Sequence, residues 1–299
     1  MRRLLIFREV ARAGSISAAA RSLGWTQPAV SQHLKALERA VGQPLLLRGP
    51  DGTSPTHAGE VLLVRADAVA SELHMADEEM AALGSLRRGR VRVAAYPSAA
   101  ATVVPRAVAT LRARHPDVDV ALTEAEPPQA VSLLGTGDVD LALVFGYDDG
   151  PPADAGGLVW RPLGDEPVVL VVGHDHPAGR RRGLRLADLA HEEWVVGCER
   201  CRAHTVQRCA AAGFEPRVRH VSDDYVVVQN LVAVGLGVTL LPRSALEAYR
   251  HPGVRVREHG SFGTRRIGVA HREGADQVPA TAALLRALPG AGRVGTIGG

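Results

Sequence analysis

Residues 14–42 read GSISAAARSLGWTQPAVSQHLKALERAVG, and this stretch decides how the first part of the chain folds. It predicts two helices joined by a short turn at Gly24, because glycine readily adopts the backbone conformation that ends a helix. Ser17 is placed to cap the first helix and Thr26 the second, since hydroxyl side chains accept hydrogen bonds from the free amides there. Pro28 falls in the first turn of the second helix, where it removes no intrahelical bond. With a further amphipathic helix near the N-terminus, the pattern is that of a helix-turn-helix.

The second of these helices has two chemically different faces. Its apolar side chains recur at helical spacing and should face the core, namely Val30, Leu34, Leu37 and Val41. Its opposite face is polar and short of carboxylates, with Gln27, Pro28, Ser31, Gln32 and Lys35. A helix that reads DNA needs hydrogen-bonding side chains toward the base edges and no negative charge facing the phosphates. The pattern favours DNA binding over an ordinary solvated helix surface.

Charge is unevenly distributed along the chain. Residues 1–48 carry eight basic and two acidic side chains, whereas the remaining residues carry 27 basic and 30 acidic side chains. The net charge of +3 therefore hides a basic N-terminal segment. Such a segment suits a polyanionic partner such as double-stranded DNA, although a solvated surface would have the same composition.

A heptad pattern follows the basic segment. Apolar residues alternate in steps of four and three and form one seam, with Leu62, Ala66, Val69, Leu73, Ala76, Met80 and Leu83. A helix with such a seam must bury it, either on the chain's own domain or against a second copy. We favour a coiled coil with a second copy, because pairing two DNA-reading units matches a twofold-symmetric site. Gly84 and the run Arg87-Arg88-Gly89-Arg90 then mark a hinge.

Beyond the hinge, stretches typical of strands and helices alternate. Residues 91–95 alternate like a strand, 99–114 are helical, and 118–123 form a second strand. The same cycle recurs toward the C-terminus. Alternating strands and helices predict α/β layers with a mainly parallel sheet.

Several of these stretches resemble the LysR-type transcriptional regulators. The resemblance rests first on Gly14–Leu23, Thr26–Leu34 and Leu37–Gly42, continued by Leu45–Arg48 and Thr56–Glu60. Leu47 stands where members usually carry Phe, which changes core packing only. Later motifs extend the resemblance over essentially the whole chain, namely Asp138–Leu143, Gly173–Pro177, Val232–Val238 and Leu241-Pro242.

The resemblance implies an α/β protein overall, with an N-terminal all-α winged helix-turn-helix and two α/β lobes similar to type 2 periplasmic binding proteins. The implied domains are a DNA-binding domain over 1–56, a linker and dimerisation helix over 57–86, a hinge over 87–90 and an effector-binding domain over 91–299. Within the last, lobe I takes about 91–162 and 267–299, and lobe II about 163–266.

The resemblance also implies which residues approach DNA. The wing at Pro50-Asp51-Gly52 would touch the backbone or the minor groove. The candidate DNA-binding residues are Ser17, Thr26, Gln27, Pro28, Ser31, Gln32, Lys35 and Arg48.

A small-molecule effector of such a fold lies between the lobes, near the carboxyl ends of the strands. Ser98 follows the first strand at a helix start, where free amides favour an anion, and the family often uses this position for a carboxylate. Each candidate also fits a plain role as cleft wall or helix cap. The candidate effector-binding residues are Ser98, Thr102, Phe145, Gly146, Cys198, Arg202 and Asp224.

The three cysteines leave an alternative open. Cys198, Cys201, His204 and Cys209 have metal-like spacing, and the cysteines also suit a thiol switch or ordinary buried thiols. The alternative function is thus the same regulator sensing metal or redox state. A cysteine- or metal-dependent enzyme is more remote, because no nucleophile–base–orienter signature accompanies these residues. We assign no metal site, no cofactor and no catalytic activity from the sequence.

Composition narrows the class of protein further. The 299 residues suit two or three domains, and no apolar run reaches about 18 residues. Charges stand too early for a signal peptide, so we expect a cytoplasmic protein without a membrane partner. A solute-binding protein would fit residues 91–299 but would leave the first 90 without a role. The expected partners are double-stranded DNA, an effector, a second copy as homodimer or homotetramer, and RNA polymerase.

Overall fold

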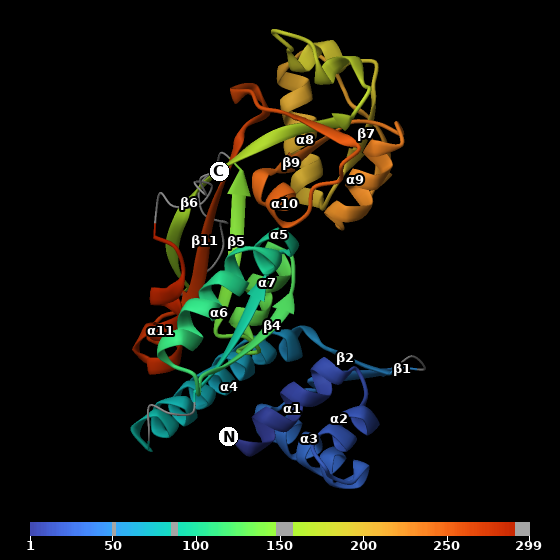
Figure 1. Ribbon diagram of the computed structural model, residues 1–299. Coiled ribbons are helices and arrows are strands. Elements are labelled where there is room, and N and C mark those ends of the chain that lie inside the picture. The colour runs from blue at the N-terminus through green and yellow to red at the C-terminus, as the bar shows by residue number, and fades with distance from the viewer. Residues whose placement is uncertain (50–51, 85–88, 148–157, 291–299) are drawn as a thin grey trace. The chain divides into compact units, whose positions relative to one another are not determined.

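The computed structural model describes residues 1–49, 52–84, 89–147 and 158–290 (Figure 1). It divides into two compact units. Unit 1 comprises Met1–Met80 and Gly135–Asp138, and unit 2 comprises Ala81–Leu134 and Val139–Gly299. The wing tip at Pro50-Asp51 and Arg87-Arg88 of the expected hinge lie outside the described residues.

Unit 1 is a bundle of helices with a β-hairpin. Its elements are α1 Arg2–Ala13, α2 Ile16–Ser22, α3 Gln27–Val41, β1 Leu46–Gly49, β2 Gly52–Pro55 and α4 His57–Gly84. The core is built from one face of each of the first three helices and from the chain before the hairpin, with Ile6, Phe7, Val10, Ala19, Val30, Leu34 and Leu45 among its buried members. This arrangement confirms the expected winged helix-turn-helix.

Two local expectations for unit 1 are wrong. The N-cap of α2 is Ser15 rather than Ser17, and its hydroxyl accepts a bond from the Ala18 amide at 3.4 Å. The reason is that Gly14 ends α1 in a left-handed conformation with φ of 61°, so the next helix starts earlier. Val41 is 41% exposed instead of buried, because the core covers α3 only as far as Leu37.

Thr26 does stand at the N-cap of α3, and Pro28 lies in its first turn. The Thr26 side chain makes no capping hydrogen bond in this position. Its hydroxyl is therefore not needed to start the helix, which Pro28 favours through its fixed φ.

The start of α4 packs tightly on the rest of unit 1. A Cβ at Gly59 would clash with the Leu45 carbonyl oxygen, so only glycine fits there. Leu62 packs against the core of unit 1 and Ala66 is fully buried, so these seam positions are covered by the chain itself. Val61, Val64 and Met80 remain exposed, whereas the side chain of Leu83 is not among those described.

Unit 2 is built around one curled seven-stranded sheet, ordered β10-β6-β11-β5-β3-β4, with β9 also paired to β6. Its strands are β3 Arg90–Ala95, β4 Asp119–Glu124, β5 Leu141–Tyr147, β6 Leu158–Gly173, β9 Thr239–Pro242, β10 Val254–Arg257 and β11 Thr264–Arg272. A separate pair contains β7 Glu193–Val196 and β8 Arg217–Val221.

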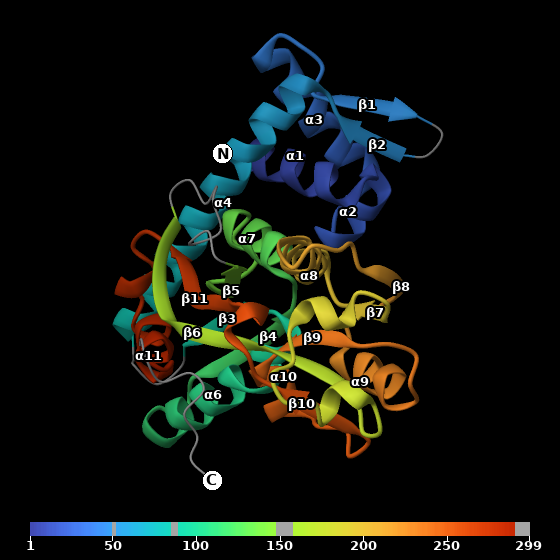
Figure 2. The same ribbon diagram turned by 90° about the horizontal axis from the view of Figure 1, so that it is seen from above.

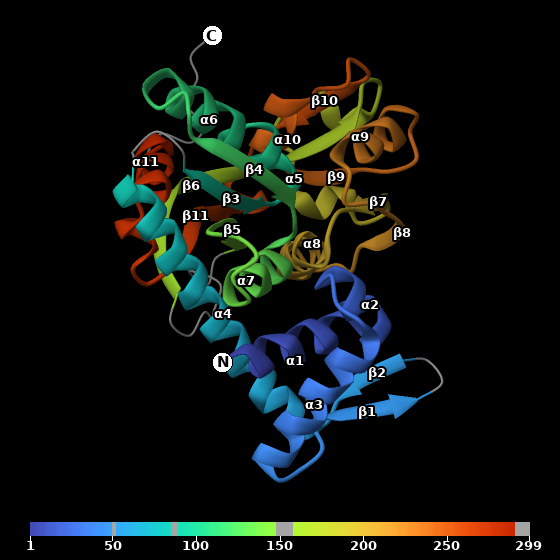
Figure 3. The same ribbon diagram turned by 90° about the horizontal axis from the view of Figure 1, so that it is seen from below.

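Helices cover the faces of these sheets. They are α5 Pro97–Ala101, α6 Val103–Arg114, α7 Pro127–Gly135, α8 Glu199–Ala211, α9 Tyr225–Ala233, α10 Arg243–Ala248 and α11 Pro279–Ala287. Short 3-10 turns add η1 Pro177–Gly179, η2 Leu186–Leu189, η3 Gly260–Phe262 and η4 Ala275–Gln277. Figure 3 shows α6 on one side of the β3–β4–β5 layer and α7 on the other.

The strand β6 belongs to both lobes. Its first part, up to Pro167, pairs with β11, whereas Val168–Gly173 pairs with β9 and β10. Figure 2 shows it running from beside α11 toward α9 and α10. The resemblance implies a boundary between the lobes at about 162–163. The structure carries one long strand across this boundary, because β11 supplies hydrogen-bonding partners along its earlier part.

The expectation of a mainly parallel sheet is wrong. Parallel pairing in the large sheet is confined to β4, β3 and β5, and β7 with β8 is also parallel. The connecting strands β6 and β11 pair antiparallel with each other and with their other neighbours, because they run in opposite directions between the lobes. The helix expected over 99–114 is also divided, since Thr102 leaves the helical conformation.

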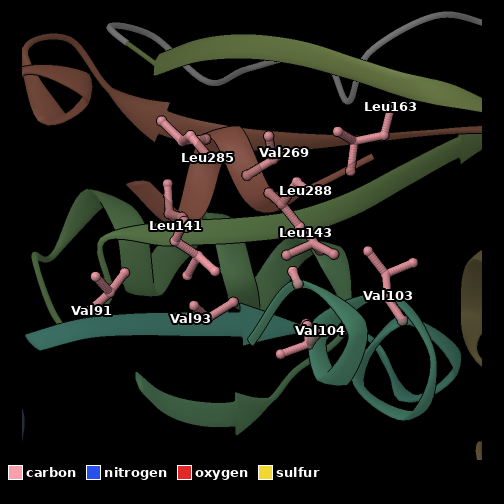
Figure 4. Close-up of a cluster of buried hydrophobic side chains, with 14 of the residues drawn as sticks. Val91, Val93, Val103, Val104, Leu141, Leu143, Leu163, Val269, Leu285 and Leu288 are labelled. Carbon is pink, nitrogen blue, oxygen red and sulfur yellow. The ribbon is translucent and has the colours of Figure 1, made fainter. Parts of the chain in front are cut away.

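Apolar side chains on one face of the sheet in the first lobe hold α6 and α11 against it (Figure 4). The cluster includes Val91, Val93, Val104, Leu141, Leu143, Val269, Leu285 and Leu288. The second lobe has its own cores, one of them around Trp194, Cys209 and Phe262. Among the described helices, none combines the length and the apolar character needed to cross a bilayer.

Candidate functional site

A cavity lies between the two lobes of unit 2, at the carboxyl ends of their strands. Its cavity volume is about 40 Å³, and it is partly open to solvent. Ser98 follows β3, Glu126 follows β4, Cys198 follows β7 and Asp223 follows β8, and all four line the cavity. Open α/β sheets place their ligands at this edge.

Arg265 is the most deeply buried cation of the cavity wall, with 2% of its surface exposed. Its Nε atom lies 2.6 Å from Oε2 of Glu166, which is equally buried. Its terminal amino group donates to the hydroxyl oxygens of Ser98 at 2.7 Å and Ser244 at 3.2 Å. The Glu166 carboxylate also accepts a hydrogen bond from the Ser244 amide. The two opposite charges therefore compensate each other in the interior.

Aromatic rings complete the surroundings of the guanidinium. Its carbon lies 4.7 Å from the centre of the Tyr96 ring and 4.6 Å from that of Phe145. A guanidinium at this distance is attracted to the ring faces. In the sheet, Arg265 stands directly opposite Tyr147 of β5 on one side and Glu166 of β6 on the other. Strand register alone thus brings these side chains together.

Three of the sequence-predicted effector residues, Ser98, Phe145 and Cys198, line the cavity. Ser98 is buried, and its hydroxyl accepts from Arg265, which leaves the hydroxyl proton available to donate.

The other four lie elsewhere. The Thr102 hydroxyl donates to the Ser98 carbonyl at 2.6 Å, and Thr102 lines a different cavity. Gly146 pairs with Arg266 within the sheet. Arg202 is exposed on α8, and Asp224 caps α9 by accepting bonds from the amides of residues 226 and 227. None of these four is among the residues that line the cavity.

Sequence reasoning missed Arg265 and Glu166, although a signal was present. Arg265 shares the period-two face of β11 with Ile267 and Val269, which are both buried. Glu166 likewise shares one face of β6 with Val168, which is buried. A charge in register with a buried apolar face predicts an internal ion pair.

Glu126 gives the cavity an acidic group. Burial raises the pKa of Glu126, while a hydrogen bond from Cys198 and the positive charges of Arg265 and Arg200 oppose that rise. Its Oε2 atom is buried and has no hydrogen-bond partner among the described residues. The cavity thus contains a carboxylate oxygen that a ligand is able to satisfy.

The cysteines and His204 have metal-like spacing in the sequence, but they do not come together in the structure as a set of metal ligands. Cys198 and Cys201 lie together, but Cys209 is buried in the separate core around Trp194. The Nε2 atom of His204 lies 2.7 Å from the Phe262 carbonyl oxygen. Within the described ranges, no three His, Cys, Asp or Glu side chains converge as metal ligands. The four residues follow one helix, whose turns direct them to different neighbours.

In unit 1, the polar face of α3 is open. Thr26, Gln27, Pro28, Gln32 and Lys35 are exposed and Ser31 is partly exposed, whereas Val30 and Leu34 are buried. Ser17 is partly exposed within α2, and Arg48 lies on β1 of the hairpin.

Glu38, the acidic residue of α3, has its carboxylate hydrogen-bonded within unit 1. Its Oε1 atom accepts hydrogen bonds from the amides of Leu45 at 2.9 Å and Leu46 at 3.4 Å. Its charge therefore holds the chain that leads into the hairpin, and the exposed start of α3 carries no carboxylate.

Comparison with known proteins identifies the class of this fold and site. Residues 1–60 match the bacterial regulatory helix-turn-helix domain of the LysR family, and residues 84–292 match the LysR substrate binding domain. The chain belongs to the LysR family and is a DNA-binding transcriptional regulator.

Curated relatives agree with this assignment. The chain is 33% identical over 287 residues to the probable HTH-type transcriptional regulator LrrA of Synechococcus elongatus, with 95% of both chains covered. It is 36% identical over 247 residues to the small neutral protease regulatory protein of Streptomyces coelicolor, covering 80% of this chain and 76% of that protein. A full-length OxyR variant from Pseudomonas aeruginosa has the same fold, with a TM-score of 0.73, 21% identity, and 96% and 94% of the two chains covered.

Loss of the Arg265 side chain should destabilise unit 2 strongly. Arg265→Met leaves Glu166 buried without its cation, which should lower the free energy of unfolding by about 3–5 kcal/mol in denaturant titration. Arg266→Met is the matched control, because its contact with Asp165 at 3.4 Å is exposed, and it should cost less than about 1 kcal/mol. Arg265→Met combined with Glu166→Leu should recover much of the loss, since both charges are then removed. Equal destabilisation by the two single variants would contradict a special role for the buried pair.

The acidic cavity group should make stability depend on pH. Because burial raises the pKa of Glu126 in the folded state, its protonated form is favoured there, and this contribution is lost as pH rises through the folded pKa. Glu126→Gln should therefore raise the thermal midpoint near pH 8 and change it little near pH 4, with the exposed Glu124→Gln as control. If the stabilisation by Glu126→Gln became smaller as pH rises, the pKa of Glu126 would not be raised in the folded state.

Proposed function

We propose that this LysR-type regulator is controlled by a small polar organic effector that binds in the cavity between the lobes of unit 2. The observation that carries the proposal is the cavity itself, because it lies at the carboxyl ends of the strands and is lined by Glu126, one of whose carboxyl oxygens has no partner among the described residues. Ser98 supplies a hydroxyl donor, and Glu126 supplies an acceptor. The rings of Tyr96 and Phe145 supply an apolar wall.

The charges of the wall favour a neutral or amine-bearing effector over a carboxylate. Arg265, the cation that lines the cavity, is already paired with Glu166. Glu126 and Asp223 add two acidic groups to the lining, and Arg200, although near Glu126, is not part of it. A carboxylate would meet these groups without a free cation to compensate it. We therefore replace the carboxylate suggested by the family resemblance with this class.

DNA is read, in this proposal, by the exposed start of α3. Gln27, Ser31 and Gln32 would approach the bases, since amides and hydroxyls both donate and accept hydrogen bonds. The remaining candidates would position the protein on the backbone, namely Ser17, Thr26, Pro28, Lys35 and Arg48.

We further propose that the regulator works as a homodimer or homotetramer in the cytoplasm and recruits RNA polymerase, without catalytic activity of its own. The exposed apolar residues Val61, Val64 and Met80 on α4 support pairing with a second copy. Effector binding would close the lobes and change the spacing of the paired DNA-reading units, and so the bend of the DNA.

Substitution on α3 tests the DNA contact. Gln32→Ala should weaken binding to the intergenic DNA upstream of the regulator's own gene by about 5- to 100-fold, because one good base contact contributes about 1–3 kcal/mol. Gln43→Ala is the matched control, since Gln43 is also exposed but follows the far end of α3. Affinity is measured by footprinting across a salt series, in which specific binding falls steeply with salt. Equal affinities for the two variants would contradict the assignment of α3 as the reading helix.

A further inference from the structure

Two thiols lie side by side in the wall of the effector cavity. The sulfur atoms of Cys198 and Cys201 are 3.1 Å apart, and both residues line the cavity. Cys198 is the N-cap of α8, with extended ψ of 166°, and Cys201 is the third residue of the helix. An N-cap side chain turns back over the first turn and so meets the third residue. This geometry leaves the sulfurs about 1 Å farther apart than in a disulfide bond.

We propose that Cys198 and Cys201 form a reversible dithiol–disulfide pair that is oxidised by low-molecular-weight disulfides and controls effector binding in the same cavity. The regulatory half of this proposal rests on the proposed function, whereas the thiol chemistry does not. Both cysteines are free in the structure.

The surroundings make Cys201 the nucleophile. The pKa of Cys201 is lowered chiefly by a hydrogen bond from the Cys198 thiol, with further help from the Tyr147 hydroxyl at 3.4 Å and the charge of Arg265. The pKa of Cys198 is raised for the complementary reason that its proton is shared with Cys201, and burial adds to the rise. A thiol with a lowered pKa next to a second thiol is the arrangement that thiol–disulfide exchange requires.

The exchange is balanced in two steps. The Cys201 thiolate attacks one sulfur of the external disulfide, so that a mixed disulfide forms and one thiolate leaves. The Cys198 sulfur then attacks Cys201, the bond between the two cysteines forms, and the second external sulfur leaves as a thiol with the proton of Cys198. The external disulfide is reduced to two thiols, and the two cysteines are oxidised by two electrons.

Oxidation changes groups that an effector would meet. It replaces the two sulfur atoms that make the Cys198–Cys201 and Tyr147–Cys201 hydrogen bonds with a disulfide, and it leaves no thiol proton beside Glu126. Since these residues line or adjoin the cavity, oxidation state and effector occupancy become linked equilibria. Cys209 takes no part, because it is fully buried in the core around Trp194.

The test is equilibration of the reduced full-length protein with glutathione buffers of increasing oxidised fraction, followed by acid quenching, alkylation and peptide mass spectrometry. We expect an intramolecular Cys198–Cys201 bond in the wild type and in Cys209→Ala, the matched control. Cys198→Ser should instead trap Cys201 as a mixed disulfide with glutathione. Failure of the bond to form at any ratio, or its formation with Cys209, would overturn the proposal.

The effect of the Tyr147 hydroxyl on the reactivity of Cys201 is measured separately. Tyr147→Phe should shift the pH profile for alkylation of Cys201 to higher pH, because one hydrogen bond to the thiolate is lost, whereas Tyr225→Phe should leave that profile in place. An unchanged profile in Tyr147→Phe would contradict the stated origin of the reactivity.

Control of DNA binding by the two cysteines is tested separately, by footprinting on the DNA upstream of the regulator's own gene. The oxidised and reduced forms should differ at least fivefold in affinity, or in footprint length, in wild type but not in Cys201→Ser. Equal footprints of the fully oxidised and reduced wild type would overturn control by the pair. Absence of any specific footprint in the reduced protein would refute the proposed function and leave the thiol result standing.

Discussion

The buried ion pair between Arg265 and Glu166 is the interaction on which the organisation of the sensor unit depends. The two residues face each other on β11 and β6, the strands that pass between the lobes. An isolated charge at this depth would be strongly destabilising, so each residue requires the other. Their hydrogen bonds to Ser98 of one lobe and Ser244 of the other place one polar network across both. The pair therefore fixes the point at which the lobes meet.

The cavity follows from this arrangement. Because the strands of both lobes end beside the pair, the turns after β3, β4, β7 and β8 converge on the same space. The pair neutralises its own charges, so the polar character of the cavity comes from Ser98, Glu126 and Asp223. The ring faces of Tyr96 and Phe145 cover the guanidinium and supply an apolar surface next to these groups. The result is a small site with a donor, acceptors and aromatic walls.

Much of the fold followed from local patterns. Helical spacing and glycine turns located α1, α2 and α3, and strand alternation located β3 and β4, because each pattern is set by residues close together in the sequence. The antiparallel course of β6 and β11 was not predictable in this way, since it depends on pairing between residues 99 positions apart, as with Arg265 and Glu166. The cap at Ser15 was missed because Gly14 decides where α1 ends.

The site was predictable only in part for the same reason. Ser98 and Cys198 were identified because they follow strands, and Phe145 because it lies near the end of one, at the edge where such folds bind ligands. Arg202 and Asp224 follow strands too, but the first turn of α8 directs Arg202 to solvent, and Asp224 is used to cap α9. Glu126 carries no local motif, and the strand pattern that marks Arg265 as buried does not name its neighbours, because the proximity of the two residues results from the assembly of two lobes.

The most direct test of the account is whether cavity occupancy changes DNA binding. A compound that stabilises the wild type against heat, but not a variant with the cavity filled by Ser98→Phe, is added to the complex of the regulator with its own upstream DNA. The account predicts that this compound changes the affinity or the length of the footprint, because the two equilibria are linked. A compound that binds the cavity and alters neither quantity would contradict the account.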